Sequence, residues 1–245
     1  VAILIWGCVF CAIAALCIFL SSNYDREKRR YLILMESFAS MLLLMDAMAH
    51  IFSGYPGVPG SVMVRISSFL VFLLSDVVLL CFHIYVCVYL FSKRERRTLK
   101  RVKAGYVIAA AEVAFVVISQ FTHWYYYIDG DNCYHRAPLY IMSILLSAAG
   151  LLIDLTLLLQ YKKRVSRKLL FSMLSCIVLP AVAAAVQVFW YGISLIEFSV
   201  GISMIIMFIV TMTELNQEMY ELISREGKIK ERLEIATILN KCIAE

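Results

Sequence analysis

Seven long apolar stretches dominate the chain, and polar residues cluster between and after them. The stretches cover approximately residues 1–22, 31–53, 67–92, 104–121, 139–161, 169–191 and 194–213. A helix needs about 20 apolar residues to cross a bilayer core roughly 30 Å thick, so each stretch has about the length of a membrane span. The pattern predicts an all-α fold, an integral membrane seven-helix bundle over residues 1–213, followed by a polar segment over 214–245.

The segments between the stretches alternate in charge. Most Lys and Arg residues lie in NYDREKRR (23–30), KRERRTLKRVK (93–103) and KKRVSRK (162–168), whereas YPGVPGSVMVRI (55–66) has one Arg. Because basic loops tend to remain in the cytoplasm, we predict an outside N-terminus and a cytoplasmic C-terminus. Seven spans also require the two ends to lie on opposite sides of the membrane.

One polar segment, FTHWYYYIDGDNCYHRAPLY (121–140), separates the fourth and fifth stretches on the predicted outer side. Its centre, DGDN (129–132), is a turn signal between two runs of high β-propensity, which predicts a short extracytoplasmic β-hairpin. Tyr127, Asp129, His135 and Arg136 are candidate contacts for an unknown small polar or anionic ligand. The alternative is an aromatic belt at the level of the lipid headgroups.

Ionisable residues also occur inside the spans, where they are costly and usually face the bundle interior. Asp46 and His50 stand one helical turn apart and share a face. Asp76 lies at a comparable depth, and Glu112 lies near the middle of the fourth span. We expect Asp46, His50 and Asp76 to form one polar cluster under the hairpin, and Glu112 is a further candidate ligand-binding residue. The alternative is a set of buried hydrogen bonds that only fix packing.

The polar segment 214–245 shows the apolar repeat of a coiled coil. Leu215, Leu222, Ile229, Ala236 and Ile243 occupy d-like positions, and Met219, Glu226, Leu233 and Asn240 occupy a-like positions. Glu226 and Asn240 weaken such a seam, and Gly227 lowers helix stability by about 1 kcal/mol relative to Ala. We therefore predict a cytoplasmic coiled-coil signalling linker that makes the protein a homodimer. The alternative is an amphipathic helix lying on the inner leaflet.

Composition supports the membrane assignment. Hydrophobic residues make up 62% of the 245, and the mean hydropathy of +0.82 exceeds that of a typical soluble domain. The net charge of +5 resides in the loops, so nucleic acid is not an expected partner, whereas membrane lipid is. Most cysteines lie in apolar stretches and no zinc-type spacing occurs. We expect no disulfide framework, no metal site and no cofactor.

Several stretches together resemble a known kind of protein. The seven spans, IDGDNCYHRAPLY (128–140), KKRVSRK (162–168) and the final REGKIKERLEIATILNKCIAE (225–245) resemble the N-terminal seven-span sensor regions of bacterial diguanylate cyclases and histidine kinases. GGDEF-domain proteins of gut Firmicutes are the nearest in pattern. The resemblance implies a bacterial cytoplasmic membrane protein whose output domain follows Glu245.

The resemblance implies a signal-sensing input module that regulates a cytoplasmic diguanylate cyclase. Neither a GGDEF signature nor a kinase histidine box occurs in these residues, so no catalytic residue is expected in the chain itself. A retinal protein would need a Schiff-base lysine in its last span, and 194–213 contains none. Two alternatives stay open: the input module of a sensor histidine kinase, and a small-solute or proton-coupled transporter.

Overall fold

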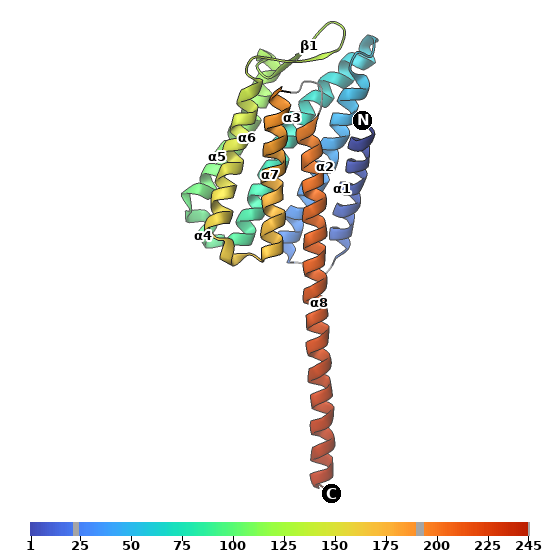
Figure 1. Ribbon diagram of the computed structural model, residues 1–245, viewed down its shortest axis with the longest axis vertical. Coiled ribbons are helices and arrows are strands. Elements are labelled where there is room, and N and C mark those ends of the chain that lie inside the picture. Colours follow the sequence, from blue (N-terminus) through green and yellow to red (C-terminus); the bar gives the residue numbers. More distant parts are fainter. Residues whose placement is uncertain (22–24, 190–193, 245) are drawn as a thin grey trace.

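The protein is a bundle of long helices with one short hairpin (Figure 1). A computed structural model describes residues 1–21, 25–189 and 194–244, without the side chains of residues 97, 231 and 234–244. The elements, in chain order, are α1 (Ala2–Leu20), α2 (Arg26–Phe52), α3 (Gly57–Leu90), α4 (Lys93–Thr98), α5 (Lys100–Thr122), β1 (Tyr126–Ile128), β2 (Tyr134–Arg136), α6 (Tyr140–Gln160), η1 (Lys162–Arg164), α7 (Arg167–Phe189) and α8 (Leu195–Ala244). All of them except α4, β1, β2 and η1 are helices long and apolar enough to cross a membrane, and these number seven in the described part of the chain. The predicted all-α class and the predicted number of spans are confirmed.

The bundle has two distinct ends. The hairpin of β1 and β2 covers one end, here called the hairpin end. The short helices α4 and η1 lie at the other, the tail end, where α8 leaves the bundle (Figure 1). The basic segments 93–103 and 162–168 therefore lie together at the tail end, opposite the segment around the hairpin.

The long helices form a closed arrangement. α2 packs between α1 and α3, and α3 also contacts α5 and α6. α7 contacts both α6 and α8, and α8 also contacts α1 and α2, which closes the ring of helices. The first span-forming helix and the last therefore share an interface, and the start of α8 lies among residues of α2 and α7.

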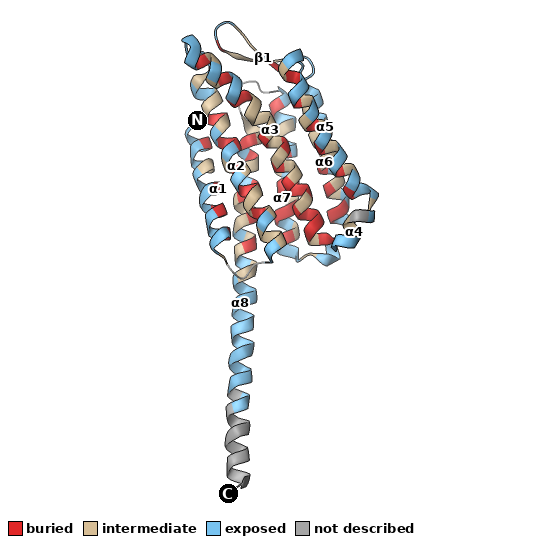
Figure 2. Ribbon diagram, turned by 180° about the vertical axis from the view of Figure 1, so that it is seen from behind, coloured by how far each residue is buried: buried red, intermediate tan, exposed pale blue. Residues whose placement is uncertain are grey.

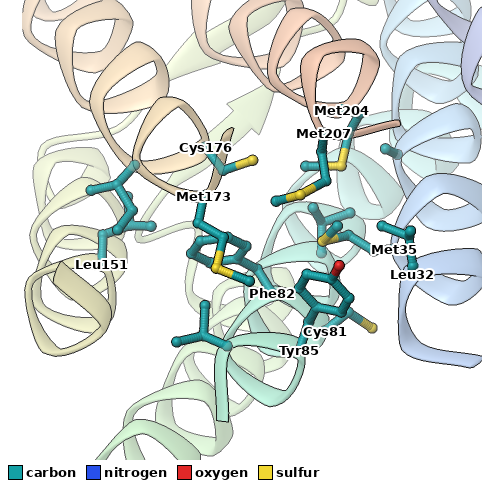
Figure 3. Packing of buried hydrophobic residues seen from close by; sticks show 14 of the residues in the cluster. Leu32, Met35, Cys81, Phe82, Tyr85, Leu151, Met173, Cys176, Met204 and Met207 are labelled. Carbon is teal, nitrogen blue, oxygen red and sulfur yellow. The ribbon is translucent and has the colours of Figure 1, made fainter. Parts of the chain in front are cut away.

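Apolar side chains fill the interior and also cover the outside. The inner cluster is rich in sulfur-containing side chains, among them Met35, Met173, Cys176 and Met207 (Figure 3). Large apolar side chains are also exposed along the outer faces of the bundle, where water would not suit them (Figure 2). Apolar residues on both sides of a helix are expected where the surroundings are lipid. These features are those of a multi-pass membrane protein.

Two boundaries differ from the predictions. α3 begins at Gly57, ten residues before the predicted span at 67, so most of the predicted loop 55–66 is helical. Its Pro59 falls in the first turn, where a missing backbone N–H costs no helical hydrogen bond. α8 is one helix of 50 residues, so the predicted boundary between 213 and 214 is not a break in secondary structure.

Candidate functional site

The predicted hairpin is present, and its turn is built on one carboxylate. Tyr127 pairs with His135 across the two antiparallel strands. Oδ1 of Asp129 accepts hydrogen bonds from the backbone N–H of Cys133 at 2.8 Å and of Asp131 at 3.0 Å. Oδ2 of Asp129 lies 2.7 Å from Nε2 of His135. The hydrogen bond from the Cys133 N–H lowers the pKa of the Asp129 carboxyl most, and the hydrogen bond with His135 lowers it further. The acid and the histidine thus fix the shape of the turn.

Aromatic side chains hold the hairpin against the bundle. The ring of Tyr126 stacks on Phe72 of α3 at 5.2 Å with an angle of 1° between the planes. Tyr125 is fully buried, and its backbone N–H donates to the Ser119 hydroxyl of α5 at 3.0 Å. Burial raises the pKa of Tyr125 to about 12, and the nearby acids Asp76 and Glu112 add to the increase. Tyr127 faces the other way: it is exposed and stacks on the His135 ring at 5.2 Å.

A second contact connects the hairpin to the first turn of α8. Nη1 of Arg136 donates to the backbone oxygen of Gln187 near the end of α7, at 2.9 Å. The side-chain Oε1 of Gln187 accepts from the backbone N–H of Ile196, also at 2.9 Å. The guanidinium of Arg136 lies over the Tyr140 ring, 4.6 Å from its centre. We call Arg136, Gln187 and Ile196 the hairpin relay, because they connect β2, α7 and α8 in sequence.

A shallow groove opens beside the hairpin relay. It has a volume of about 220 Å³ and is lined by Arg136, Tyr140 and the apolar side chains of α6 and α7, including Ile141, Ile144 and Val188. An arginine at the edge of an apolar groove suits a ligand with a carboxylate or phosphate and an apolar part. Arg136 is therefore placed at a concave surface, whereas Asp129 and His135 engage each other.

The predicted pair Asp46 and His50 shares one face of α2, as expected. Nε2 of His50 lies 3.7 Å from Oδ1 of Asp46. Both contact the hydroxyl of Ser194, which directly precedes α8: it donates to Asp46 at 3.0 Å and lies 2.7 Å from Nε2 of His50. Glu197, in the first turn of α8, interacts electrostatically with Asp46 and with Arg136. This group therefore belongs to the start of α8.

The expectation that Asp76 joins Asp46 and His50 is wrong. Asp76 lies on α3 and interacts electrostatically with Glu112 of α5 and with Tyr125. α2 and α3 are neighbours, but Asp76 stands one helical turn from Phe72, which packs against Tyr125 and Tyr126 at the hairpin. The candidate polar residues form two groups, one at α8 and one under the hairpin.

Another buried acid has a defined structural partner. Nδ1 of His83 on α3 lies 2.6 Å from Oδ1 of Asp154 on α6, and Nε2 of His83 donates to the backbone oxygen of Val102 at 3.1 Å. Asp154 therefore has a structural partner on a neighbouring helix. Because Nε2 already donates, the short contact to Asp154 holds one proton between ring and carboxyl.

The linker residues lie along the exposed half of α8. Leu222, Glu226, Gly227, Ile229 and Leu233 are exposed on this helix beyond the bundle (Figure 2). The side chain of Asn240 lies outside the described residues. The described part of the chain contains no group of three or more His, Cys, Asp or Glu residues arranged to hold a metal ion.

Three residues of these groups were not predicted. Gln187 is a lone amide in an apolar span, which is a usable sequence signal. Ser194 precedes a helix and Tyr125 lies in an aromatic run, so neither stands out. Comparisons with known protein families, characterised proteins and solved structures find no match for this chain.

Proposed function

We propose that this chain is a membrane-embedded signal-sensing input module that passes a change at the hairpin end to a cytoplasmic output domain. The observation that carries the proposal is the continuity of α8. Its first turn is bonded to the hairpin relay through Gln187 and Ile196, and the same helix, 50 residues long in all, continues out of the bundle into the exposed linker. Such a helix is about 75 Å long, more than twice the thickness of a bilayer core.

A ligand in the groove would act on α8 through Arg136. The guanidinium presents a planar set of donors that suits a carboxylate or phosphate. An anionic ligand competes with the backbone oxygen of Gln187 for these donors. Because Gln187 also holds the N–H of Ile196, a shift of this turn moves the start of α8. The protein then has two states that differ in the position of α8. A small polar or anionic ligand has different affinities for these two states, which is the requirement for a switch.

The linker half of α8 is suited to pairing with a second copy. Leu222, Ile229 and Leu233 are 60%, 63% and 68% exposed and belong to the predicted seam. Packing them against the same residues of a partner helix removes this apolar surface from water. Glu226 and Gly227 interrupt the seam, so two pairings separated by only a few kcal/mol are accessible, and a ligand can shift that balance.

The basic segments at the tail end support a cytoplasmic linker. By the positive-inside rule, the tail end faces the cytoplasm and the hairpin faces outside, in a bacterial cytoplasmic membrane. Single cysteines introduced at Ser166 and at Gly130 should react with a membrane-impermeant reagent from opposite sides. Reaction of both from the same side would contradict this orientation.

The proposed output is cyclic-di-GMP synthesis, which the resemblance to sensor regions of diguanylate cyclases implies. In the full-length protein, we expect cyclic-di-GMP synthesis in membranes to depend on the hairpin relay. Gln187→Leu removes the acceptor of the Ile196 N–H and should uncouple output from stimulus. Gln160→Leu, at the tail end of α6 where Gln160 accepts from Arg101, is the matched control and should leave regulation intact. ATP-dependent autophosphorylation without cyclic-di-GMP synthesis would favour the histidine kinase alternative.

Pairing of the linker is tested in the same membranes. With Cys242 replaced by Ser, single cysteines at Leu222 and Ile229 should crosslink between two chains. Glu226→Leu fills the gap in the seam and should fix the output in one state, whatever the stimulus. An absence of crosslinks at both positions, with normal regulation in Glu226→Leu, would show that the linker does not transmit by pairing.

A further inference from the structure

The groove beside the hairpin relay combines one positive charge with apolar walls. Arg136 lines it together with Tyr140, Ile144 and the apolar side chains around them on α6 and α7. The guanidinium of Arg136 is held in place, because it lies over the Tyr140 ring and donates to the backbone oxygen of Gln187 at 2.9 Å. The groove therefore presents a fixed cation next to an apolar surface.

The position of Arg136 along the bundle matches the level of lipid headgroups. α6 begins at Tyr140, four residues after Arg136, and is 21 residues long. At about 1.5 Å per residue, its length is about 30 Å, which equals the thickness of the hydrocarbon core. Trp124 and Tyr127, exposed aromatic residues of the hairpin segment, suit the membrane–water boundary at the same end. Arg136 is therefore level with the phosphates of the leaflet at the hairpin end.

The apolar wall of the groove continues along the outside of the bundle. Ile141, which lines the groove, shares one face of α6 with Leu145 and Leu152, and all three are at least 50% exposed. The neighbouring helix α7 exposes Val182 and Phe189 (Figure 1). In a membrane, this exposed apolar surface contacts lipid chains. A molecule in the groove can therefore extend directly into the bilayer.

The size of the groove limits what it can hold. Its volume of about 220 Å³ is below the range of roughly 300–1,000 Å³ that is typical of pockets enclosing a drug-sized ligand. The groove thus accommodates only part of a larger ligand, and the rest lies on the apolar surface outside. A small soluble anion would contact Arg136 but leave the apolar walls uncovered. An anionic head with long apolar chains satisfies both parts of the site.

We propose that the groove binds an anionic phospholipid from the leaflet at the hairpin end. Phosphate oxygens accept hydrogen bonds from Arg136 and compete for them with the backbone oxygen of Gln187. The glycerol and the first methylenes cover Ile144 and Val188, and the acyl chains continue over Ile141. A phosphatidylglycerol head has a net negative charge that complements one arginine, whereas the choline of phosphatidylcholine adds a positive charge. The inference rests on the proposed function, because it identifies the chemical class of the ligand for that same groove.

Photoactivatable lipids test the site on the 245-residue chain in phosphatidylcholine nanodiscs. The probe is a trace of phosphatidylglycerol with a diazirine near the glycerol end of one acyl chain, and mass spectrometry locates the crosslinks. We expect this probe to label residues 141–145 roughly tenfold more than phosphatidylcholine with the same diazirine chain, because hydrogen bonds to charged groups are strong enough for such a preference. Labelling near the basic segment 162–168 is the internal reference, since any anionic lipid is attracted there.

Arg136→Gln should reduce phosphatidylglycerol labelling of 141–145 to the level of phosphatidylcholine. Arg65→Gln is the matched control, because Arg65 is an exposed arginine near the hairpin residue Tyr126 and is not among the residues that line the groove. Since Arg136 also holds the end of α7, a second variant keeps it: Val188→Trp fills the groove and should lower the same labelling. Val182→Trp, on exposed α7 surface outside the groove, should leave the labelling unchanged.

Equal labelling of 141–145 by the two lipids in the unsubstituted chain would overturn the proposal. Full phosphatidylglycerol labelling in both Arg136→Gln and Val188→Trp would also overturn it, because the lipid would then bind elsewhere. Loss of the labelling when millimolar inorganic phosphate replaces chloride at constant ionic strength would show a site for soluble anions instead. The measurement needs no output domain, whereas Gln187→Leu tests the proposed function in the full-length protein, so the two can fail separately.

Discussion

The same three helices, α3, α5 and α6, hold buried acids in two contrasting regions. Toward the tail end, Asp154 has a histidine partner at 2.6 Å, and that histidine is held in turn by the Val102 carbonyl. Toward the hairpin end, Glu112 hydrogen-bonds with Ser147, but Oδ2 of Asp76 and Oε1 of Glu112 have no hydrogen-bond partner within the described residues. Both regions are buried to a similar degree. Burial alone therefore does not distinguish an acid that fixes the bundle from one available to bind.

The difference lies in the partners of each acid. A buried group whose hydrogen bonds are all made resists change, because any movement leaves a donor or acceptor unpaired. A buried acid with an unpaired oxygen retains capacity for a proton or a new donor. Substitution should therefore reduce stability more at the tail-end pair than at the hairpin-end acids.

The largest expected effect is from Asp154→Ala. It leaves His83 buried without its acid, and breaking a buried pair in this way costs about 3–5 kcal/mol. Unfolding of the purified chain in mixed micelles, titrated with a denaturing detergent, would measure the loss. Asp154→Asn keeps the volume and an acceptor, so it should cost less. A loss below about 1 kcal/mol for Asp154→Ala would remove the distinction between the two regions.

The same pair can be disturbed from α5 without touching its polar atoms. A Cβ added at Gly105 would collide with the His83 ring. Overpacking of this kind costs about 1–3 kcal/mol, so Gly105→Ala should destabilise the bundle in the same unfolding assay. Gly150→Ala on α6 is the matched control, since its Cβ would meet only Cγ2 of Ile108 at 3.8 Å. Equal losses in the two variants would show that the His83 ring has room to move.

The hairpin-end acids should tolerate the corresponding change. Asp76→Asn replaces an unpaired acid with a neutral amide of the same shape, which carries no penalty for a buried charge. The free energy of unfolding at neutral pH should stay within about 1 kcal/mol of the native value, in either direction. Asp154→Asn in the same assay supplies the comparison. A larger loss for Asp76→Asn than for Asp154→Asn would reverse the assignment of the two regions.

Sequence patterns predicted the elements better than the partners. Apolar stretches identified all seven long helices, and the spacing of Asp46 and His50 correctly predicted a shared face. The partner of Asp76 could not be predicted, because it depends on the rotation of α3 relative to α5. The role of Ser194 depends on where α8 starts, and that of Gln187 on an end of α7 that lies next to the hairpin. Such contacts between helices are set by tertiary packing, which a one-dimensional pattern does not contain.

The smallest effect concerns Asp129, an acid outside the bundle that contrasts with both buried pairs. Its pKa lies below the ordinary value because the Cys133 N–H and His135 stabilise the carboxylate. A lowered pKa means that the carboxylate stabilises the hairpin fully above the unfolded pKa, about 3.9 for Asp, and that this contribution disappears as the pH falls through the lower, folded value. The hairpin should therefore keep its structure from neutral pH down to about 4 and loosen only in stronger acid.

At neutral pH, Asp129→Asn should increase hydrogen exchange of the Cys133 amide severalfold, with the exchange of α3 and α5 unchanged. Asp131→Asn is the control, because Asp131 takes part in the turn through its backbone N–H and C=O. Equal exchange in the two variants would show that the turn sequence alone holds the hairpin, without the charge of Asp129.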